Sequence, residues 1–347
     1  MDEAKWTVVD VGIGQMQEMR SLFQRVFGHV LSEQMWSWKY DQGRGFGVGA
    51  CAPSGELLAH YGGTLRTVCF FGVEHLAIQI GDVMVAREGR AALAHKGPFG
   101  MVVQGFLARH VGQPIGPILG FGFPNARHMR LGERLGHYSQ VEKISELSWS
   151  LAARTSQSML LRSKSFVEAI DWNASFCSAT LDKLWRRMSS GLNGVVVPRR
   201  DASWWLHRYA THPEHQYLCF WVRSFWTRRI VGAIALRPHF GSAKPVGGTA
   251  LTWELMDWIA PVGLTELVLQ SAMEVVRTHN GTTLMGWFSA TASKGFITPP
   301  TSANEVCTAG VTVPDNGVSF PLASSASLSL DSFVERWWLT GGDTDFR

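Results

Sequence analysis

A stretch with the character of a buried strand, followed by a glycine-containing loop, constrains the fold of this 347-residue chain more than any other feature. Residues 81–87 have the pattern of a strand end, and glycines and basic side chains recur from there to Gly100. Pro98 stands where a helix with apolar residues at i, i+3 and i+4 spacing should begin. A strand, a loop and a helix N-terminus in this order present backbone N–H groups to an anion. The stretch therefore predicts a site for a phosphate-bearing ligand.

The residues before this stretch predict a strand, a helix and an antiparallel meander. Residues 5–11 alternate as a strand does, and apolar residues recur at helical spacing from Met16 to Phe27, where Gly28 predicts the C-cap. Four further strands, separated by turn residues that include Gly62-Gly63, are expected at 45–52, 57–61, 64–71 and 76–85. After the loop helix we expect a strand at 118–123, a helix at 126–135 capped by Gly136, and a strand at 141–151.

Composition describes a globular protein with a large core. The chain is 46% hydrophobic and 17% charged, and its length suits two domains. The net charge of +4 is spread along the sequence instead of forming a basic stripe, which argues against a nucleic-acid partner. We expect an anionic cofactor to account for the positive charge equally well.

The cysteines and the hydropathy pattern predict a cytoplasmic protein. The five cysteines are odd in number, far apart and without a CxxC pair, which argues for a reducing compartment and against a structural metal site. The first residues are too polar for a signal peptide, and no apolar run of about 18 residues predicts a membrane helix. We expect no metal and no membrane partner.

The order strand, helix, meander, strand–glycine loop–helix, strand, helix, strand resembles the GCN5-related N-acetyltransferase (GNAT) superfamily. In that family the fourth strand leads into a pyrophosphate loop, and the fifth strand splays away from the fourth. Residues 82–85, Asp-Val-Met-Val, are similar to the Asp-Val-x-Val end of the family's fourth strand. Residues 119–125, followed by 132–136, look like the family's second motif. The resemblance rests on these motifs over residues 1–150. Over the rest of the chain it rests only on the order of the elements.

The second half repeats the order of elements without the glycine loop. Helices are expected at 181–188 and 202–209, a hairpin at 217–236, strands at 250–259 and 283–289, and a helix from Leu264. Only residues 260–263 separate the strand from that helix, which is too short to cradle a pyrophosphate. The prediction is therefore an α/β protein of two GNAT-like domains, each with a mostly antiparallel mixed sheet: 1–152 with the acyl-CoA site, a linker at 153–165, and a degenerate copy at 166–347. Trp337-Trp338 predicts that the tail docks onto the fold or a partner.

The resemblance implies which residues hold the acyl-CoA. Strand amides near Val83 to Val85 would polarise the thioester carbonyl, loop residues would bind phosphate, and Asn125 would contact the pantetheine arm. The expected cofactor-binding residues are Val83, Met84, Val85, Arg90, Lys96, Gly97, Gly100 and Asn125.

Catalytic groups are expected beside the same strand. An amine nucleophile must lose a proton, and Asp82 and His60 are the candidate acceptors or amine anchors, each with the alternative of a purely structural role. The family's tyrosine acid aligns with Gly132, so it cannot be carried over. Tyr61 or Tyr40 could substitute for it, whereas Tyr138 is expected to point elsewhere. A departing thiolate without an assigned acid is the remaining alternative.

Aromatic residues predict either core packing or the wall of an acceptor pocket. Trp36, Trp38 and Tyr40 fall within six residues, and such groups line concave sites. The predicted function is acyl-CoA-dependent N-acyl transfer, with acetyl-CoA or another acyl-CoA as co-substrate and a small-molecule amine as acceptor, attacked directly on the thioester. The alternative is a non-catalytic acyl-CoA-binding or sensor protein. The second half leaves a homodimer open.

Overall fold

A computed structural model of the chain describes residues 6–92, 97–113, 115–151, 164–239, 252–312 and 334–344. It divides into two compact units. Unit 1 is composed of Met1–Val68, Glu74–Val141 and Thr308–Val334, and unit 2 of Cys69–Val73, Glu142–Cys307 and Glu335–Arg347. Neither unit is contiguous in sequence, whereas the predicted domains 1–152 and 166–347 are. Of the predicted linker 153–165, residues 153–163 lie outside the described residues.

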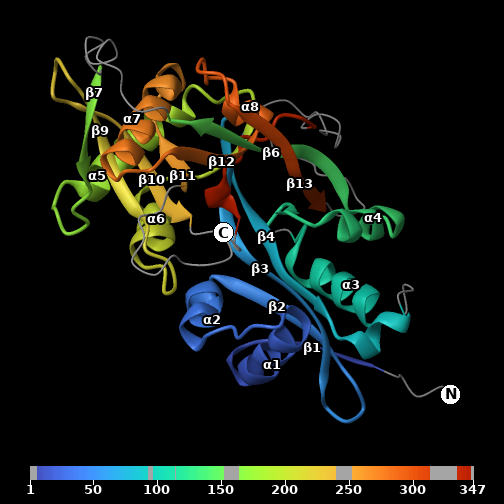
Figure 1. The fold of residues 1–347 in the computed structure, drawn as a ribbon. Coiled ribbons are helices and arrows are strands. Elements are labelled where there is room, and N and C mark those ends of the chain that lie inside the picture. The colour runs from blue at the N-terminus through green and yellow to red at the C-terminus, as the bar shows by residue number, and fades with distance from the viewer. Residues whose placement is uncertain are drawn as a thin grey trace. The chain divides into compact units, whose positions relative to one another are not determined.

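The described part of unit 1 contains a mixed sheet and the α-helices α1 to α4 (Figure 1). Its elements are β1 (Thr7–Asp10), α1 (Met16–Phe27), α2 (Glu33–Tyr40), β2 (Gly45–Cys51), β3 (Leu57–Phe70), β4 (Val73–Val85), α3 (Pro98–His110), β5 (Gly120–Gly122) and α4 (Ala126–Arg134), with the end of β13 (Ser302–Thr312). The strand order is β1-β2-β3-β4-β5-β13. Strand β4 pairs with β5 in parallel, while β1–β2, β2–β3 and β5–β13 are antiparallel.

The helices of unit 1 follow their sequence signals. Helix α1 ends at Gly28, whose φ of 79° is the left-handed conformation that glycine adopts readily. Ser32 caps α2 by accepting from the Met35 N–H, and Pro98 occupies the first turn of α3. Helices α1 and α2 cover one face of the strands and α3 the other, each over its own hydrophobic cluster (Figure 1).

Unit 2 has the same plan. Its elements are β6 (Ser139–Ser150), β7 (Ser165–Ala169), α5 (Cys177–Ser189), β8 (Val196–Pro198), α6 (Ala202–Trp205) continued by a π turn (Leu206–Ala210), β9 (Leu218–Ser224), β10 (Ile230–His239), β11 (Thr252–Ile259), α7 (Thr265–Thr278), β12 (Thr283–Ser289) and α8 (Ala290–Ser293). The strand order is β7-β9-β10-β11-β12-β6, and β11 pairs with β12 in parallel. The α/β class with a mixed sheet flanked by helices is thus confirmed.

The last strand of each sheet comes from the other half of the chain. Residues 310–312 of β13 pair with β5, and β12 pairs with β6. Strand β13 was not predicted from the sequence. Its first residues, Ser302 to Val306, are exposed, so they show no alternation between apolar and polar side chains.

One predicted turn was wrong. Gly62 and Gly63 lie inside β3, which continues without a break from Leu57 to Phe70. A Cβ atom at Gly62 would lie 2.6 Å from the His60 ring, and one at Gly63 would lie 2.4 Å from Ile78. The two glycines are therefore required because neighbouring side chains occupy the space that a Cβ atom would need. A single sequence does not distinguish glycines of this kind from glycines in a turn.

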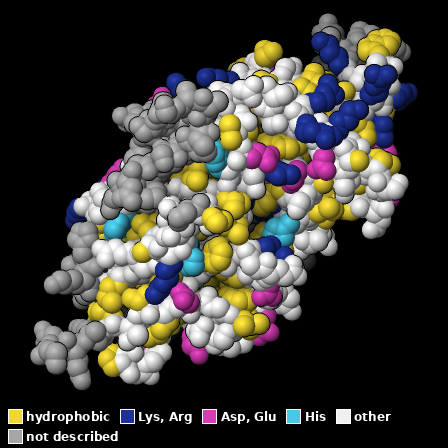
Figure 2. Space-filling view, turned by 180° about the vertical axis from the view of Figure 1, so that it is seen from behind, with side chains coloured by type: hydrophobic (Ala, Val, Ile, Leu, Met, Phe, Trp, Pro, Cys, Tyr) yellow, Lys and Arg dark blue, Asp and Glu magenta, His cyan; other side chains and the backbone are white. Residues whose placement is uncertain are grey.

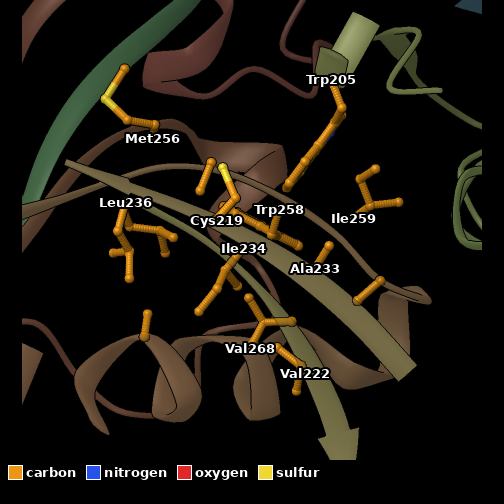
Figure 3. Close-up of a cluster of buried hydrophobic side chains, with 14 of the residues drawn as sticks. Trp205, Cys219, Val222, Ala233, Ile234, Leu236, Met256, Trp258, Ile259 and Val268 are labelled. Atoms are coloured by element: carbon orange, nitrogen blue, oxygen red, sulfur yellow. The ribbon is translucent and has the colours of Figure 1, made fainter. Parts of the chain in front are cut away.

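The core of unit 2 is rich in aromatic residues. Trp205, Trp221 and Trp258 are almost completely buried, and Figure 3 shows Trp205 reaching toward the strands that carry Ile234 and Trp258. The C-terminal segment belongs to this core, because Trp337 is 0% and Trp338 4% exposed. Docking of the tail, predicted from these two tryptophans, is confirmed. Complete burial of a smaller apolar side chain such as Leu or Phe is already worth about 1.5–3 kcal/mol.

The surface carries mixed charge. On the face seen in Figure 2, Lys and Arg side chains gather toward one corner and elsewhere alternate with acidic and neutral groups. The helices among the described residues include none that is both long and apolar enough to cross a bilayer. All five cysteines are free thiols.

Candidate functional site

The end of β4 separates from its neighbour β5. The parallel pairing runs from Ile78 opposite Gly120 to Ile80 opposite Gly122, whereas β4 continues to Val85. In this part of β4, which no longer pairs with β5, Asp82 has a φ of 50°, in the left-handed region that non-glycine residues rarely adopt. The strand is therefore locally distorted where it leaves β5, and such distortions persist only where surrounding contacts hold them.

A cavity of about 460 Å³ adjoins this strand end. Its wall combines apolar side chains with a basic rim and is lined by Val26 and Phe27 of α1, Val83 and Val85 of β4, Phe99 of α3, and Asn125, Arg127, His128, Arg130, Leu131 and Arg134 at α4. The volume lies in the range of small-molecule sites. Two predicted cofactor-binding residues of β4 thus share one cavity with Asn125.

Three arginines form the basic rim. Arg127, Arg130 and Arg134 recur at i, i+3 and i+7, so they lie on one face of α4. Among the described carboxylates, none forms an ion pair with any of the three. A guanidinium group binds phosphate oxygens through paired N–H bonds, which makes this rim suited to a polyanion.

The predicted phosphate loop is described only at its ends. Gly97 is the N-cap of α3 in an extended conformation, and Gly100 is buried in the first turn. Lys96 lies outside the described residues, and of Arg90 only the backbone is described, in a short 3-10 helix (Arg87–Ala92).

Asn125 caps α4. Its side-chain oxygen accepts from the N–H groups of Arg127 and His128, at 3.1 and 3.0 Å. These bonds fix the side chain at the rim of the cavity and leave its NH₂ group to donate to a ligand. The short strand before it ends because Pro124 cannot donate to a ladder.

A buried charge cluster surrounds Asp82. Lys39 Nζ lies 2.8 Å from Oδ1, and Tyr40 Oη donates to Oδ2 at 2.6 Å. The Lys39 and Asp82 side chains are 5% and 7% exposed. Burial would raise the pKa of Asp82, but the Lys39 charge and the hydrogen bonds from Lys39 and Tyr40 hold this pKa below its ordinary value.

His60 contacts the main chain of the same residue. Its Nδ1 lies 2.8 Å from the Asp82 carbonyl oxygen, which can only accept, so Nδ1 carries the proton and Nε2 is the basic nitrogen. Burial lowers the pKa of His60 below 6.5, against the opposing effect of Asp82. Nε2 faces Gly47 of β2, where an added Cβ would lie 2.6 Å away. The ring is therefore neutral near pH 7.

Tyr61 lies on the opposite face of the sheet from His60, as alternation along β3 requires. Its hydroxyl accepts from the Tyr138 hydroxyl at 2.7 Å. Burial raises the pKa of both phenols, so both remain protonated near neutral pH. Tyr138 also contacts Gly132, because Gly136 with φ 71° turns the chain back over α4. A Cβ at Gly132 would lie 2.0 Å from the Tyr138 ring, which explains why no larger residue stands there.

Gly132→Ala is expected to destabilise unit 1 by about 1–3 kcal/mol, since overpacking against Tyr138 outweighs the gain in helix propensity of roughly 1 kcal/mol. Urea denaturation measures the effect. In the double variant with Tyr138→Ala the two costs should not add, because the clash disappears. Additive costs would show that the ring does not fill this space.

The aromatic residues predicted for the acceptor pocket separate by burial. Trp36 and Tyr40 are 3% and 8% exposed and belong to the core under α1 and α2, while Trp38 is half-buried. Met84, between the two cavity-lining valines, points to that core and is 1% exposed. Sequence reasoning missed Lys39 and the α4 arginines. The i, i+3, i+7 spacing of the arginines on an expected helix was a usable signal for the second group.

No protein-family model matches the sequence, and comparison with curated proteins gives no match. Solved structures do match. A GCN5-related N-acetyltransferase from Kribbella flavida has a TM-score of 0.64 at 14% identity, covering 90% of this chain and 72% of its own. A GCN5-related N-acetyltransferase from Anabaena variabilis has a TM-score of 0.61 at 13% identity, covering 89% and 72%. The chain has the GNAT fold.

The GNAT likeness spans both units. The N-myristoyltransferase of Saccharomyces cerevisiae, solved with bound myristoyl-CoA, matches with a TM-score of 0.56 at 8% identity over 89% of this chain and 83% of its own. Coverage of about nine-tenths of this chain in each case means that the likeness extends over both units and not over one half alone. Identities this low show the fold and carry no residue roles.

Proposed function

We propose that the chain is an acyl-CoA-dependent N-acyltransferase whose co-substrate binds in the cavity beside the end of β4. The observation that carries this proposal is the cavity itself. An apolar wall formed by Val83, Val85 and Phe99 meets a rim of three α4 arginines, which matches a ligand with a thioester arm and a polyphosphate end. The GNAT fold, whose matched structures include N-acetyltransferases and an N-myristoyltransferase with bound myristoyl-CoA, supports the same reading.

An acyl-CoA would supply a thioester whose carbonyl carbon an amine attacks, with CoA leaving as the thiol. In this proposal the amides of Val83 to Val85 polarise the carbonyl, since β4 has parted from β5 there. Asn125, Gly97 and Gly100 bind the arm and the phosphates, together with Arg90 and Lys96. The acceptor is the amine of a small molecule, reached from the side of α2 past Trp38. Acetyl is the proposed acyl group, and the location is cytoplasmic.

The test follows thiol release. Purified protein is incubated with acetyl-CoA, then with longer acyl-CoAs, and a panel of amines, while free thiol is read with a chromogenic disulfide. We expect release that requires both a donor and an amine. CoA binding measured by calorimetry is the parallel readout, since it reports on the cavity independently of chemistry.

The second candidate is a protein that binds acyl-CoA without turnover. The observation in its favour is Gly132, which leaves α4 without a tyrosine beside the cavity residue Leu131. This candidate predicts calorimetric binding of CoA with no thiol release for any donor and amine. Absence of both binding and release would reject the two functions together.

A further inference from the structure

The apex of the β9–β10 hairpin holds a tryptophan in solvent. Residues 225–229 join the two strands in a tight turn. The Arg228 N–H donates to the Ser224 carbonyl at 2.9 Å, and the Ser224 N–H donates to the Arg229 carbonyl at 2.9 Å. Trp226 lies within this turn and is 78% exposed, although tryptophan is on average a well-buried residue. The turn therefore presents Trp226 outward, apart from the core of unit 2.

Two more exposed apolar side chains lie at the same end of this sheet. Strand β10 is antiparallel to β11, which is parallel to β12, so the start of β10 and the ends of β11 and β12 lie together. Val262, just beyond the end of β11, is 45% exposed, and Ile297, beyond the end of β12, is 81% exposed. The Ile297 N–H donates to Glu266 at 2.7 Å, in the first turn of α7, which follows Val262. We call this end of the sheet the hairpin end of unit 2.

Basic side chains surround these apolar groups. The Phe225 N–H donates to the Lys164 carbonyl at 3.0 Å, which places Lys164 beside the turn. The last turn of α5 lies at the same end, since a Cβ at Gly191, just after this helix, would lie 3.1 Å from Val262. The exposed basic residues of the hairpin end are Lys164, Arg186, Arg187, Arg228 and Arg229. In the view from behind, Lys and Arg side chains crowd the side of the molecule on which Figure 1 labels β7 and β9 (Figure 2).

Carboxylates leave this positive charge uncompensated. Within the part of the chain that the structure describes, none of these five basic side chains forms an ion pair. Glu266 accepts from the N–H groups of Ile297 and Thr298 and from the Gln270 side chain, so its oxygens are engaged by the loop that carries Ile297. The hairpin end is therefore both apolar and positively charged.

We propose that the hairpin end of unit 2 docks onto an anionic membrane surface. Trp226 lies among the lipid headgroups, where an amphipathic indole ring is favoured, and the basic side chains face the anionic groups. Each basic residue near such a surface strengthens binding about fivefold. Peripheral contact needs no membrane-spanning helix, whereas the absence of a long apolar run, from which no membrane partner was predicted, bears on spanning helices alone.

The arrangement of the apolar groups favours a fluid surface over a rigid partner. Trp226, Val262 and Ile297 stand on three separate loops, with basic side chains among them. A folded protein would need a hollow for each side chain within about 1,000 Å² of matched surface, whereas lipid headgroups part around each one. Nucleic acid binds basic side chains through its phosphates and gains little from exposed aliphatic groups such as Val262 and Ile297.

The first experiment measures co-sedimentation of the full-length protein with lipid vesicles. The vesicles are pure phosphatidylcholine or equal parts of phosphatidylcholine and phosphatidylserine. We expect binding to the mixed vesicles that weakens as salt is added, and little binding to the pure ones, because salt screens the attraction to anionic headgroups. Equal binding to both kinds of vesicle, or no binding to either, would overturn the proposal.

The second experiment removes the groups of the hairpin. Arg228→Gln with Arg229→Gln should weaken binding to the mixed vesicles about 10- to 30-fold, because two attracted charges are lost. Trp226→Ala should weaken it about tenfold, because the apolar surface that leaves water is lost. All three side chains are exposed, so the melting temperature should stay that of the wild type. Wild-type binding in both variants would overturn the proposal.

Matched controls remove equivalent groups elsewhere. The charge control is Arg109→Gln with Arg277→Gln, since each of these arginines has an acidic partner. The apolar control is Phe176→Ala, at the N-terminus of α5 beyond the far end of β7, where the side chain is 48% exposed. Both controls should bind the mixed vesicles as the wild type does. Losses as large as those of the hairpin variants would show that binding does not depend on the hairpin end.

Lipid quenching locates the tryptophan directly. With brominated phosphatidylcholine in the mixed vesicles, the fluorescence of the wild type should fall, and Trp226→Phe should still bind but lose most of this quenching. Unchanged quenching in Trp226→Phe would overturn insertion of Trp226. The arginine variant is also titrated with a single-stranded oligonucleotide. Wild-type binding to the oligonucleotide that is tighter than to the vesicles, and that the arginine variant loses, would make nucleic acid the partner and overturn the proposal. Neither readout depends on acyl transfer.

Discussion

Replacing Arg127 and Arg130 together by glutamine is expected to weaken CoA binding by about 10²- to 10⁴-fold. Each guanidinium lines the cavity rim from one face of α4, and each charge-assisted bond to a phosphate oxygen is worth about 1.5–3 kcal/mol. The glutamines keep the length and helix propensity of the side chains, so α4 should remain intact. Isothermal titration with CoA, and with CoA lacking its 3′-phosphate, measures the loss.

The matched control is Arg109→Gln on α3. Arg109 is 39% exposed, pairs with Asp10 at 3.3 Å, and does not line the cavity. This variant removes one positive charge from the same unit and should bind CoA as the wild type does. The double variant should also show a weaker salt dependence of binding than the wild type, because two of the charges that salt screens are gone. Equal affinity in the double variant and the wild type would place the polyphosphate end elsewhere.

The parts of the fold that depend on residues close together in the sequence were predictable. Helix α1 ends before Gly28, as this glycine predicts, and α4 begins at Ala126, as expected, with Asn125 as its N-cap. Capping of this kind depends only on neighbouring backbone groups. The exchange of β6 and β13 between the units was not predictable, since strand pairing between distant segments leaves no mark on either sequence. The turn predicted at Gly62-Gly63 was wrong for a similar reason, because the contacts that require glycine there come from the side chains of His60 and Ile78.

The candidate site likewise combines residues that local motifs predicted with contacts between distant residues that no local motif predicted. Asp82, Val83, Val85 and Asn125 were predicted to lie at a strand end and just before a helix, because the order of motifs marks these places, and all four lie there in the structure. Tyr138 was expected to point elsewhere, yet it covers Gly132 through the turn at Gly136. The partnership of Lys39 with Asp82 joins residues 43 positions apart.

Arg200→Met is expected to destabilise unit 2 by about 3–5 kcal/mol, the cost of leaving a buried charge without its partner. Arg200 is 0% exposed, and it donates to Asp257, Asp343 and the Pro198 carbonyl while its guanidinium lies 4.4 Å from the Trp338 ring centre. Methionine fills much of the volume but leaves the two carboxylates without compensation. Because three of the 15 tryptophans lie in unit 1, urea unfolding followed by tryptophan fluorescence reports mainly on unit 2.

The pH dependence of this loss identifies its cause. Burial already raises the pKa of Asp257, and Arg200 opposes that rise. Without Arg200 the folded state binds a proton that the unfolded chain releases above about pH 4, so the stability of the variant should fall as pH rises from 5 to 8. Adding Asp257→Asn and Asp343→Asn should restore most of the loss by removing both charges. The neighbouring Arg199→Met, whose pair with Asp201 is 38% and 13% exposed, should cost at most about 1 kcal/mol. Equal losses in the Arg199 and Arg200 variants, or a loss that does not change with pH, would show that Arg200 stabilises unit 2 by packing and not by charge.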